Sequence, residues 1–176
     1  MSDVIIRAAT AADIPAITAI YAFEVREKTA SFEMTPPIEA EMMSRFTALS
    51  DNGFPYLAAE ADGHVAGYAY AGPYRPRPAY RYTVENSVYL DPAYYRRGIG
   101  SALLNELIAQ CTARGFRQMI AVIGDSANAA SIGLHRRAGF AMIGTHPNVG
   151  FKFGRWLDSV QMQLALGEGG TTRPPG

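Results

Sequence analysis

The sequence predicts an α/β domain in which one mixed sheet carries helices on both faces. Extended and helical patterns alternate along the chain in the order β-α-α-β-β-β-α-β-α-β-β. This order combines a β-hairpin, which makes antiparallel neighbours, with strand–helix–strand crossovers, which make parallel ones. The 176 residues are 48% hydrophobic and 18% charged, a balance typical of one globular domain. We therefore expect a single domain over residues 1–166 and a flexible tail over residues 167–176.

The first quarter of the chain predicts one strand and two helices. The β-branched run "VIIRAAT" predicts a strand at residues 4–10. A helix follows, because Ile14, Ile17, Ile20 and Tyr21 recur at helical spacing, with Thr10 as its cap and Asp13 three residues later. The periodicity fails in "TASFEMTPP", which predicts a loop. Pro37 then suits the first turn of a second helix, "IEAEMMSRFTAL".

The middle of the chain predicts three strands. "YLAAEADGHVAGYAYAG" reads as two strands that turn at Asp62-Gly63, the strongest hairpin signal present. Alternate prolines make "PYRPRPAY" irregular and extended. A strand resumes at residues 81–90, and alternation assigns its residues to two faces. One face holds Tyr82, Val84, Asn86, Val88 and Leu90, and the other holds Thr83, Glu85, Ser87 and Tyr89.

The last part of the chain predicts two helices and three strands. The clearest helix is "GSALLNELIAQCTARG", which stops at Gly115. "QMIAVIG" predicts a buried strand, and a short helix runs from about Asn128 to Gly139. Residues 141–166 predict two final strands around an irregular, glycine-bearing middle.

Composition limits the functions that the chain can have. The formal net charge is zero, so no overall field favours nucleic acid or an acidic membrane. No segment approaches about 20 uninterrupted apolar residues, and the N-terminus lacks a basic, apolar leader. The single cysteine, Cys111, lies on the apolar stripe of its helix, so we expect a buried thiol, no internal disulfide and a reducing, cytoplasmic location.

The junction "YYRRGIGSALL" at residues 94–104 is the main candidate binding site. A helix that begins near Gly98 to Gly100 leaves its first backbone amides without intrahelical partners, and the helix dipole adds partial positive charge there. Those amides bind a pyrophosphate well, and Arg96 and Arg97 add cationic contacts. The alternative is a solvated turn before a helix, because short glycine motifs alone are weak evidence.

The series of "ENSVYLDP", this junction, its helix, "MIAVIG" and "NAASIGLHRRAGF" resembles the GCN5-related N-acetyltransferase (GNAT) family over residues 4–166. "RPAYRYTVENSVYL", "AVIG" and "GFKFGRWLD" resemble its phosphinothricin and methionine sulfoximine acetyltransferase branch. The resemblance implies a mostly antiparallel, twisted sheet, acetyl-CoA as co-substrate, no metal and a homodimer. It implies cofactor contacts from Val88, Tyr89, Leu90, Arg96, Arg97, Gly98, Ile99, Gly100, Ser101 and Asn128. Tyr95 and Arg96 depart from the usual motif, which often has Arg or Gln and then Gly.

Acetyl transfer to an amine needs a base, stabilisation of the carbonyl oxygen and a route for the thiolate to leave. Glu85 is the candidate general base, since it lies in an aromatic, β-branched strand and the resembling branch has a glutamate in this role. The alternative is a solvated surface carboxylate. His135, seven residues after Asn128, either protonates the thiolate, hydrogen-bonds the thioester sulfur or is a packed histidine. We expect His64 to be solvated and assign no role to His146.

The arginine-rich loop before Glu85 predicts the acceptor. Arg75, Arg77 and Arg81 alternate with tyrosines and prolines, and arginine suits bidentate capture of a carboxylate or phosphinate. The acceptor is then a small amino acid or an analogue; the alternative is an ordinary solvated loop. With the resemblance, the expected substrate contacts are Arg75, Arg77, Glu85, Asn86 and Ser87. Phe32 and residues 148–156 are expected to supply apolar walls or a subunit contact.

Two other functions remain open at this point. One is a sensor that binds acetyl-CoA without turnover, which a Glu85→Gln substitution would leave unaffected. The other is an acetyltransferase for a polyamine, an aminoglycoside or a protein N-terminus. Cationic acceptors of this kind favour an acidic cleft, and the arginine loop argues against one.

Overall fold

The computed structural model describes residues 4–174. One seven-stranded sheet has the order β1-β2-β3-β4-β5-β7-β6. Only the β4–β5 pair is parallel, which confirms the predicted mixed, mostly antiparallel sheet. The strands are β1 (Ile5–Ala8), β2 (Tyr56–Ala61), β3 (His64–Pro73), β4 (Thr83–Leu90), β5 (Gln118–Gly124), β6 (Ala141–Lys152) and β7 (Arg155–Ala165). The helices are α1 (Ile14–Glu27), α2 (Glu39–Asp51), α3 (Ile99–Ala113) and α4 (Ala129–Arg137).

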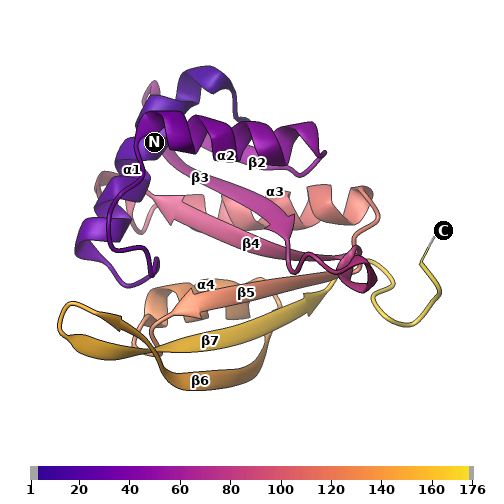
Figure 1. The fold of residues 1–176 in the computed structure, drawn as a ribbon. Coiled ribbons are helices and arrows are strands. Elements are labelled where there is room, and N and C mark those ends of the chain that lie inside the picture. Colours follow the sequence, from indigo (N-terminus) through magenta and orange to yellow (C-terminus); the bar gives the residue numbers. More distant parts are fainter. Residues whose placement is uncertain (1–3, 175–176) are drawn as a thin grey trace.

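Helices cover both faces of the sheet, as the sequence predicts (Figure 1). On one face α3 packs over β2, β3 and β4, and its buried Leu103, Leu104, Leu107 and Cys111 belong to the larger core cluster. On the other face α1 and α2 cover Tyr56 and Tyr68, which form the second cluster with the isoleucines of α1. The predicted burial of Cys111 is confirmed. The two helical layers leave the β5–β7–β6 part of the second face without a helix over it (Figure 1).

Local signals placed most element boundaries correctly. The N–H of Thr10 donates to Asp13 Oδ2 at 2.7 Å, and a short 3-10 turn, Ala11–Asp13, leads into α1. Asp62 and Gly63 both have positive φ and join β2 to β3, as the hairpin signal predicts. Gly115, at φ 85°, follows the end of α3.

Two details of the expected boundaries were wrong. Pro37 does not lie in the first turn of α2, because that helix starts at Glu39 with Ile38 as its N-cap residue. The proline loop is also less irregular than expected, because Pro78–Tyr80 forms a 3-10 turn in which Arg81 N–H donates to Pro78 O. A proline at the start of a turn has the φ that a 3-10 turn needs, so alternate prolines do not exclude one.

The expected tail lies partly outside the described residues, at positions 175 and 176. Residues 167–174 turn back toward β5. Arg117 donates to the carbonyl of Gly169 at 3.2 Å and to the hydroxyl of Thr172 at 3.0 Å. These contacts connect the chain beyond β7 to the start of β5.

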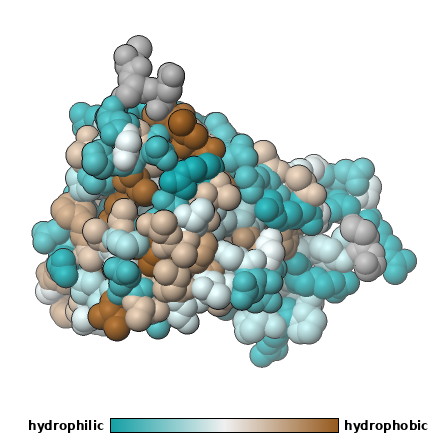
Figure 2. Space-filling view, turned by 90° about the horizontal axis from the view of Figure 1, so that it is seen from above, coloured by the Kyte–Doolittle hydropathy of each residue, from teal (hydrophilic) through white to brown (hydrophobic). Residues whose placement is uncertain are grey.

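The surface mixes polar and apolar residues. Viewed from above, hydrophobic residues occur in separate patches among hydrophilic ones (Figure 2). Within residues 4–174 no helix is both long and apolar enough to cross a membrane.

Candidate active site

The strands β4 and β5 pair for only half of their length. Thr83 to Asn86 pair with Gln118 to Ala121, and beyond Asn86 no β4–β5 pairing continues (Figure 1). Ser87 to Leu90 still pair with β3 on the other side. The β4 edge that faces β5 therefore offers backbone hydrogen-bonding groups without a strand partner. A ligand with amide groups can pair with this edge as an added strand would.

The start of α3 lies at the end of the same strand. Gly98 is its N-cap residue at φ 79°, and Ala102 N–H makes the first intrahelical bond to the Gly98 carbonyl. The amides of Ile99, Gly100 and Ser101 precede that bond and have no partner within the helix. Arg96 also has positive φ, at 63°. Exposed amides at a loop and helix start of this kind can bind an anion, and the diphosphate site at residues 96–101 stays a prediction.

The side chains around this loop have separate contacts. Arg97 Nη1 donates to Asp62 Oδ2 at 3.2 Å, and its guanidinium lies 5.0 Å from the centre of the Tyr94 ring. Tyr95 Oη donates to Glu24 Oε1 of α1 at 3.1 Å. Burial raises the pKa of Glu24. Tyr95, the departure from the usual motif, therefore fastens the loop to α1 rather than pointing a cation at the ligand.

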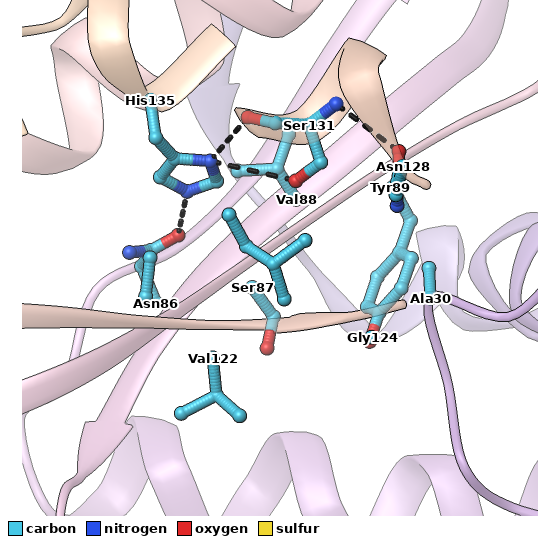
Figure 3. Close-up of a pocket in the computed structure, with 12 residues that line it drawn as sticks. Ala30, Asn86, Ser87, Val88, Tyr89, Val122, Gly124, Asn128, Ser131 and His135 are labelled. Carbon is cyan, nitrogen blue, oxygen red and sulfur yellow. Dashed lines mark hydrogen bonds between the residues drawn. The ribbon is translucent and has the colours of Figure 1, made fainter. Parts of the chain in front are cut away.

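A cavity of about 40 Å³ lies where β4 and β5 diverge. Figure 3 shows its lining: Ser87, Val88 and Tyr89 come from β4, Val122 and Gly124 from β5, and Asn128, Ser131 and His135 from the start and body of α4. Ala30, from the loop between α1 and α2, contributes on another side. Asn128 caps α4, since its Oδ1 accepts from Ser131 N–H at 3.1 Å. The predicted cofactor residues Val88, Tyr89 and Asn128 thus line one cavity.

His135 is 4% exposed and has a contact at each ring nitrogen. Nδ1 lies 2.8 Å from the Ser131 carbonyl oxygen, and Nε2 lies 2.9 Å from Asn86 Oδ1 (Figure 3). Asn86 Nδ2 donates to the Ile120 carbonyl at 3.1 Å, which turns Oδ1 toward the ring. Both contacts favour a proton on each nitrogen, whereas burial lowers the pKa of His135. Burial is the larger of the two effects, so the pKa of His135 is lowered from its ordinary value.

A second cavity, of about 540 Å³, lies on the face of the sheet that the helices leave open. Glu85 and Ile120 line it together with Tyr74 and Arg75, and residues of β6 and β7 complete the wall. Val122 lines both cavities, so they adjoin across β5. Burial raises the pKa of Glu85, and the positive charge of Arg75 opposes that shift. Within residues 4–174 no hydrogen bond engages the Glu85 carboxylate, so its oxygens can accept a proton.

The arginine loop divides between the cavity and solvent. Arg75 lines the larger cavity, and its guanidinium lies 5.0 Å from the centre of the Tyr74 ring. Arg77 and Arg81 line neither cavity, and Arg81 lies over the ring of Tyr82. His146 lines the larger cavity, whereas His64 is exposed at the hairpin. The structure thus brings Arg75 and Glu85 together, with Ser87 at the adjoining smaller cavity.

Sequence reasoning missed the groups that join the α1–α2 loop to this site. Lys152 is buried at the end of β6, and its Nζ donates to the carbonyls of Lys28 and Ser31 at 2.9 and 2.7 Å. Gly124 of β5 faces the carbonyls of Thr29 and Ala30 so closely that a side chain would not fit. A lysine within the glycine-bearing run at residues 148–156 was a faint signal. Its partners lie more than 100 residues away, and only the fold reveals them.

The arrangement suits transfer of an acyl group between two ligands. The unpaired half of β4 leads toward the start of α3, and Glu85, a carboxylate with a raised pKa, lies in the paired half of the same strand. Among the described residues, no cluster of His, Cys, Asp and Glu has the composition of a metal site.

Comparisons with known proteins identify the family of the chain. Residues 17–140 match the Acetyltransferase (GNAT) family. The chain is 55% identical to a phosphinothricin N-acetyltransferase of Alcaligenes faecalis, over 92% of this chain and 82% of that protein. It is 48% identical to an L-methionine sulfoximine/L-methionine sulfone acetyltransferase of Pseudomonas paraeruginosa, over 92% and 94%. A crystal structure of a phosphinothricin acetyltransferase from Sinorhizobium meliloti in complex with AcCoA superimposes with a TM-score of 0.95 at 51% identity, covering 98% of this chain and 93% of that one. The chain belongs to the acetyltransferase (GNAT) family.

Proposed function

We propose that this protein transfers the acetyl group of acetyl-CoA to the α-amine of a small amino acid or analogue, of the methionine sulfoximine or phosphinothricin type. The observation that carries the proposal is the adjacency of two cavities at Val122, one beside the unpaired half of β4 and one lined by Glu85 and Arg75. The similar proteins named above act on such acceptors, and a similar structure holds AcCoA.

In the proposed mechanism, the amides of residues 98–101 bind the diphosphate of acetyl-CoA, and Arg96 and Arg97 add positive charge nearby. The pantetheine arm pairs with the free edge of β4 at Val88, Tyr89 and Leu90. This pairing leads the thioester into the smaller cavity, between β4 and β5. A backbone N–H of the unpaired β4 edge stabilises the carbonyl oxygen as negative charge develops on it.

Glu85 acts as the general base in this proposal. The acceptor amine is protonated at neutral pH, and it attacks the thioester carbon only after losing a proton. The Glu85 carboxylate takes that proton directly or through a water, and its raised pKa brings it closer to the working range of a base. The amine nitrogen bonds to the carbonyl carbon and the carbon–sulfur bond breaks. The nitrogen then loses a second proton to become an amide, and the leaving CoA thiolate takes up one proton.

His135 stays a candidate for the thiolate proton donor. Its Nε2 is occupied by Asn86, so a direct transfer requires Nε2 to exchange that contact for the sulfur. With the contact intact, His135 orients Asn86 between β4 and β5.

Arg75 is the proposed partner of the acceptor's acidic group. A guanidinium beside Glu85 suits bidentate binding of a carboxylate, phosphinate or similar group and places the α-amine toward the base. Arg77 reaches the acceptor only if its loop closes over the cavity. Asn86 and Ser87 complete the proposed contacts from β4.

A release assay for the CoA thiol tests the acceptor class. Methionine sulfoximine, methionine sulfone, phosphinothricin and plain amino acids should accelerate thiol release, and spermidine or an aminoglycoside should not. Acceleration by the cationic amines alone would overturn the acceptor assignment. Thiol release with none of these compounds, despite binding of acetyl-CoA, would favour a sensor.

We further propose a homodimer that forms through exposed apolar side chains of the β6–β7 hairpin. This hairpin exposes Met142, Ile143, Val149, Phe151 and Trp156, more apolar surface than isolated side chains explain. Ile143 and Val149 also line the larger cavity, so a partner would border the acceptor site. Sedimentation should report a dimer that Trp156→Glu converts to monomer. A monomer at all concentrations would contradict this.

The single buried thiol suits a reducing compartment, and we propose a cytoplasmic location. Cell fractionation with an antibody against the chain checks it. Recovery with a membrane or secreted fraction would refute it.

A further inference from the structure

The loop between α1 and α2 crosses the open ends of β5 and β6. We call residues 28–32 the strap. A Cβ added to Gly124 would lie 3.1 Å from the Ala30 carbonyl oxygen and nearer still to that of Thr29. A Cβ added to Gly150 would lie 2.5 Å from the ring of Phe32. Two glycines thus let the strap lie directly on the sheet, one beneath each end of it.

Lys152 holds the strap in place. Its side chain is 3% exposed, and Nζ donates to the carbonyls of Lys28 and Ser31, at the start and near the end of the strap. The Ser31 hydroxyl in turn hydrogen-bonds Tyr21 Oη of α1 at 2.9 Å. A buried ammonium is costly unless its hydrogens find acceptors, and two of its three hydrogens are used by carbonyls of this one backbone segment. The strap is therefore fixed from the sheet side and from the helix side.

The middle of the strap forms a wall of the smaller cavity. Ala30 lines it and lies beside Gly124, at the end of the cavity away from His135 (Figure 3). The space in this cavity is small, at about 40 Å³. A longer acyl chain would need space that the strap occupies.

We propose that the strap restricts the transferred group to acetyl, with Ala30 as the specificity-determining side chain and Lys152 as the positioning residue that keeps Ala30 against Gly124. This inference rests on the proposed acyl transfer, because it places the thioester in the smaller cavity. One additional methylene in a pocket of this kind changes kcat/KM by about 10- to 200-fold. Propionyl-CoA should be the poorer donor by a factor in that range.

The first experiment compares kcat/KM for acetyl-CoA and propionyl-CoA at a saturating acceptor. In Ala30→Gly the preference for acetyl should fall at least about fivefold, because the missing methyl leaves room for the added methylene. Ala40→Gly, an exposed alanine of α2, is the matched control and should retain the preference. An unchanged preference in Ala30→Gly would overturn the role of Ala30.

The second experiment separates positioning from mere stability. Lys152→Met should lower the acetyl preference, while Lys28→Met, which removes an exposed ammonium but keeps the carbonyl that Lys152 binds, should retain it. Lys152→Arg retains charge and donors and should recover part of the preference. If Lys152→Met is less stable but keeps the full preference for acetyl-CoA over propionyl-CoA, Lys152 has a structural role only. If Lys152→Met does not fold, Lys152→Arg and Ala30→Gly still decide the question.

A binding measurement keeps this inference distinct from the proposed function. Calorimetry with acetyl-CoA, propionyl-CoA and free CoA needs no acceptor. Equal affinity for the two thioesters, with equal use of both as donors, would refute the acetyl filter and leave acyl transfer standing. Weaker propionyl-CoA binding with no transfer to any acceptor would support the filter and refute the proposed function.

Discussion

The two halves of the proposed active site are built in different ways. The cofactor side consists of backbone groups from one continuous stretch, the end of β4 and the start of α3. The acceptor side consists of side chains from distant segments, since Arg75, Glu85, Val122 and His146 meet only in the folded chain. The first half should tolerate side-chain changes but not backbone strain. The second should respond to single side-chain substitutions.

Glu85→Gln should have the largest effect on turnover, and this effect should come from the acceptor side alone. Removal of a general base lowers kcat by about 10²- to 10⁴-fold. The affinity for acetyl-CoA should stay within a factor of two, since the proposed diphosphate contacts are backbone amides at residues 98–101. Steady-state kinetics and calorimetry check the two statements.

Glu39→Gln is the control for that experiment, because Glu39 is an exposed carboxylate in the first turn of α2. Its kcat should match that of the unmodified protein. If Glu85→Gln keeps full turnover, Glu85 is not the base.

Gly98→Ala should affect the cofactor side alone. Gly98 has φ 79°, a conformation that costs an L-residue roughly 1–2 kcal/mol, and no atom lies within 4 Å of an added Cβ. The strain should move the loop and raise the KM for acetyl-CoA about tenfold, with the acceptor KM unchanged. Initial-rate kinetics with each substrate varied in turn measure both constants.

Gly115→Ala is a matched control for that variant, since Gly115 has φ 85° and equal open space at the other end of α3. Both variants should lose similar stability, and only Gly98→Ala should weaken acetyl-CoA. If the KM for acetyl-CoA is the same in Gly98→Ala and Gly115→Ala, the diphosphate does not bind at the start of α3.

Arg75→Gln should have a smaller effect, on the acceptor and on the pH profile. Because Arg75 is fully exposed, solvent screens its charge, and the acceptor KM should rise only about two- to fivefold. Arg75 also lowers the pKa of Glu85, so its loss should move the acidic limb of kcat/KM to higher pH. Arg81→Gln should change neither quantity, and a limb that moves to lower pH in Arg75→Gln would contradict the assignment.

The smallest expected effect is on stability. Burial raises the pKa of Glu85 above its ordinary 4.5, so the folded protein binds this proton more tightly than the unfolded chain. The buried carboxylate therefore lowers the free energy of unfolding as the pH rises above about 4.5. It has no such effect at lower pH, where the group is protonated in both the folded and the unfolded chain. Glu85→Gln should be more stable than the unmodified protein at neutral pH but not at pH 4. Urea unfolding at both values checks this, and a loss of stability at pH 7 would count against a desolvated carboxylate.

The sequence predicted what depends on local spacing. The Asp62-Gly63 turn, the alternation that separates Asn86 from Glu85 and the glycine junction before α3 all act within a few residues, and each is confirmed in position. The element order then predicted a mixed sheet, because parallel neighbours need a crossover connection, and α3 supplies one between β4 and β5.

The sequence could not predict what depends on long-range contacts. Lys152 meets the strap across more than 100 residues, and His135 meets Asn86 across 49. No periodicity indicates such pairs, since a buried lysine and an exposed one look alike in a strand. Arg75 and Arg77 also look equivalent in the sequence, yet of the two only Arg75 lines the cavity, while Arg77 is the N-cap residue of the 3-10 turn at Pro78–Tyr80.

A crystal structure of this chain with acetyl-CoA and an acceptor analogue that lacks the amine tests the central claim most directly. The diphosphate should accept hydrogen bonds from the amides of residues 98–101, the thioester should lie between Ser87 and Val122, and the analogue should lie beside Glu85. A cofactor bound away from the start of α3, or a thioester on the far side of the sheet from Glu85, would contradict it.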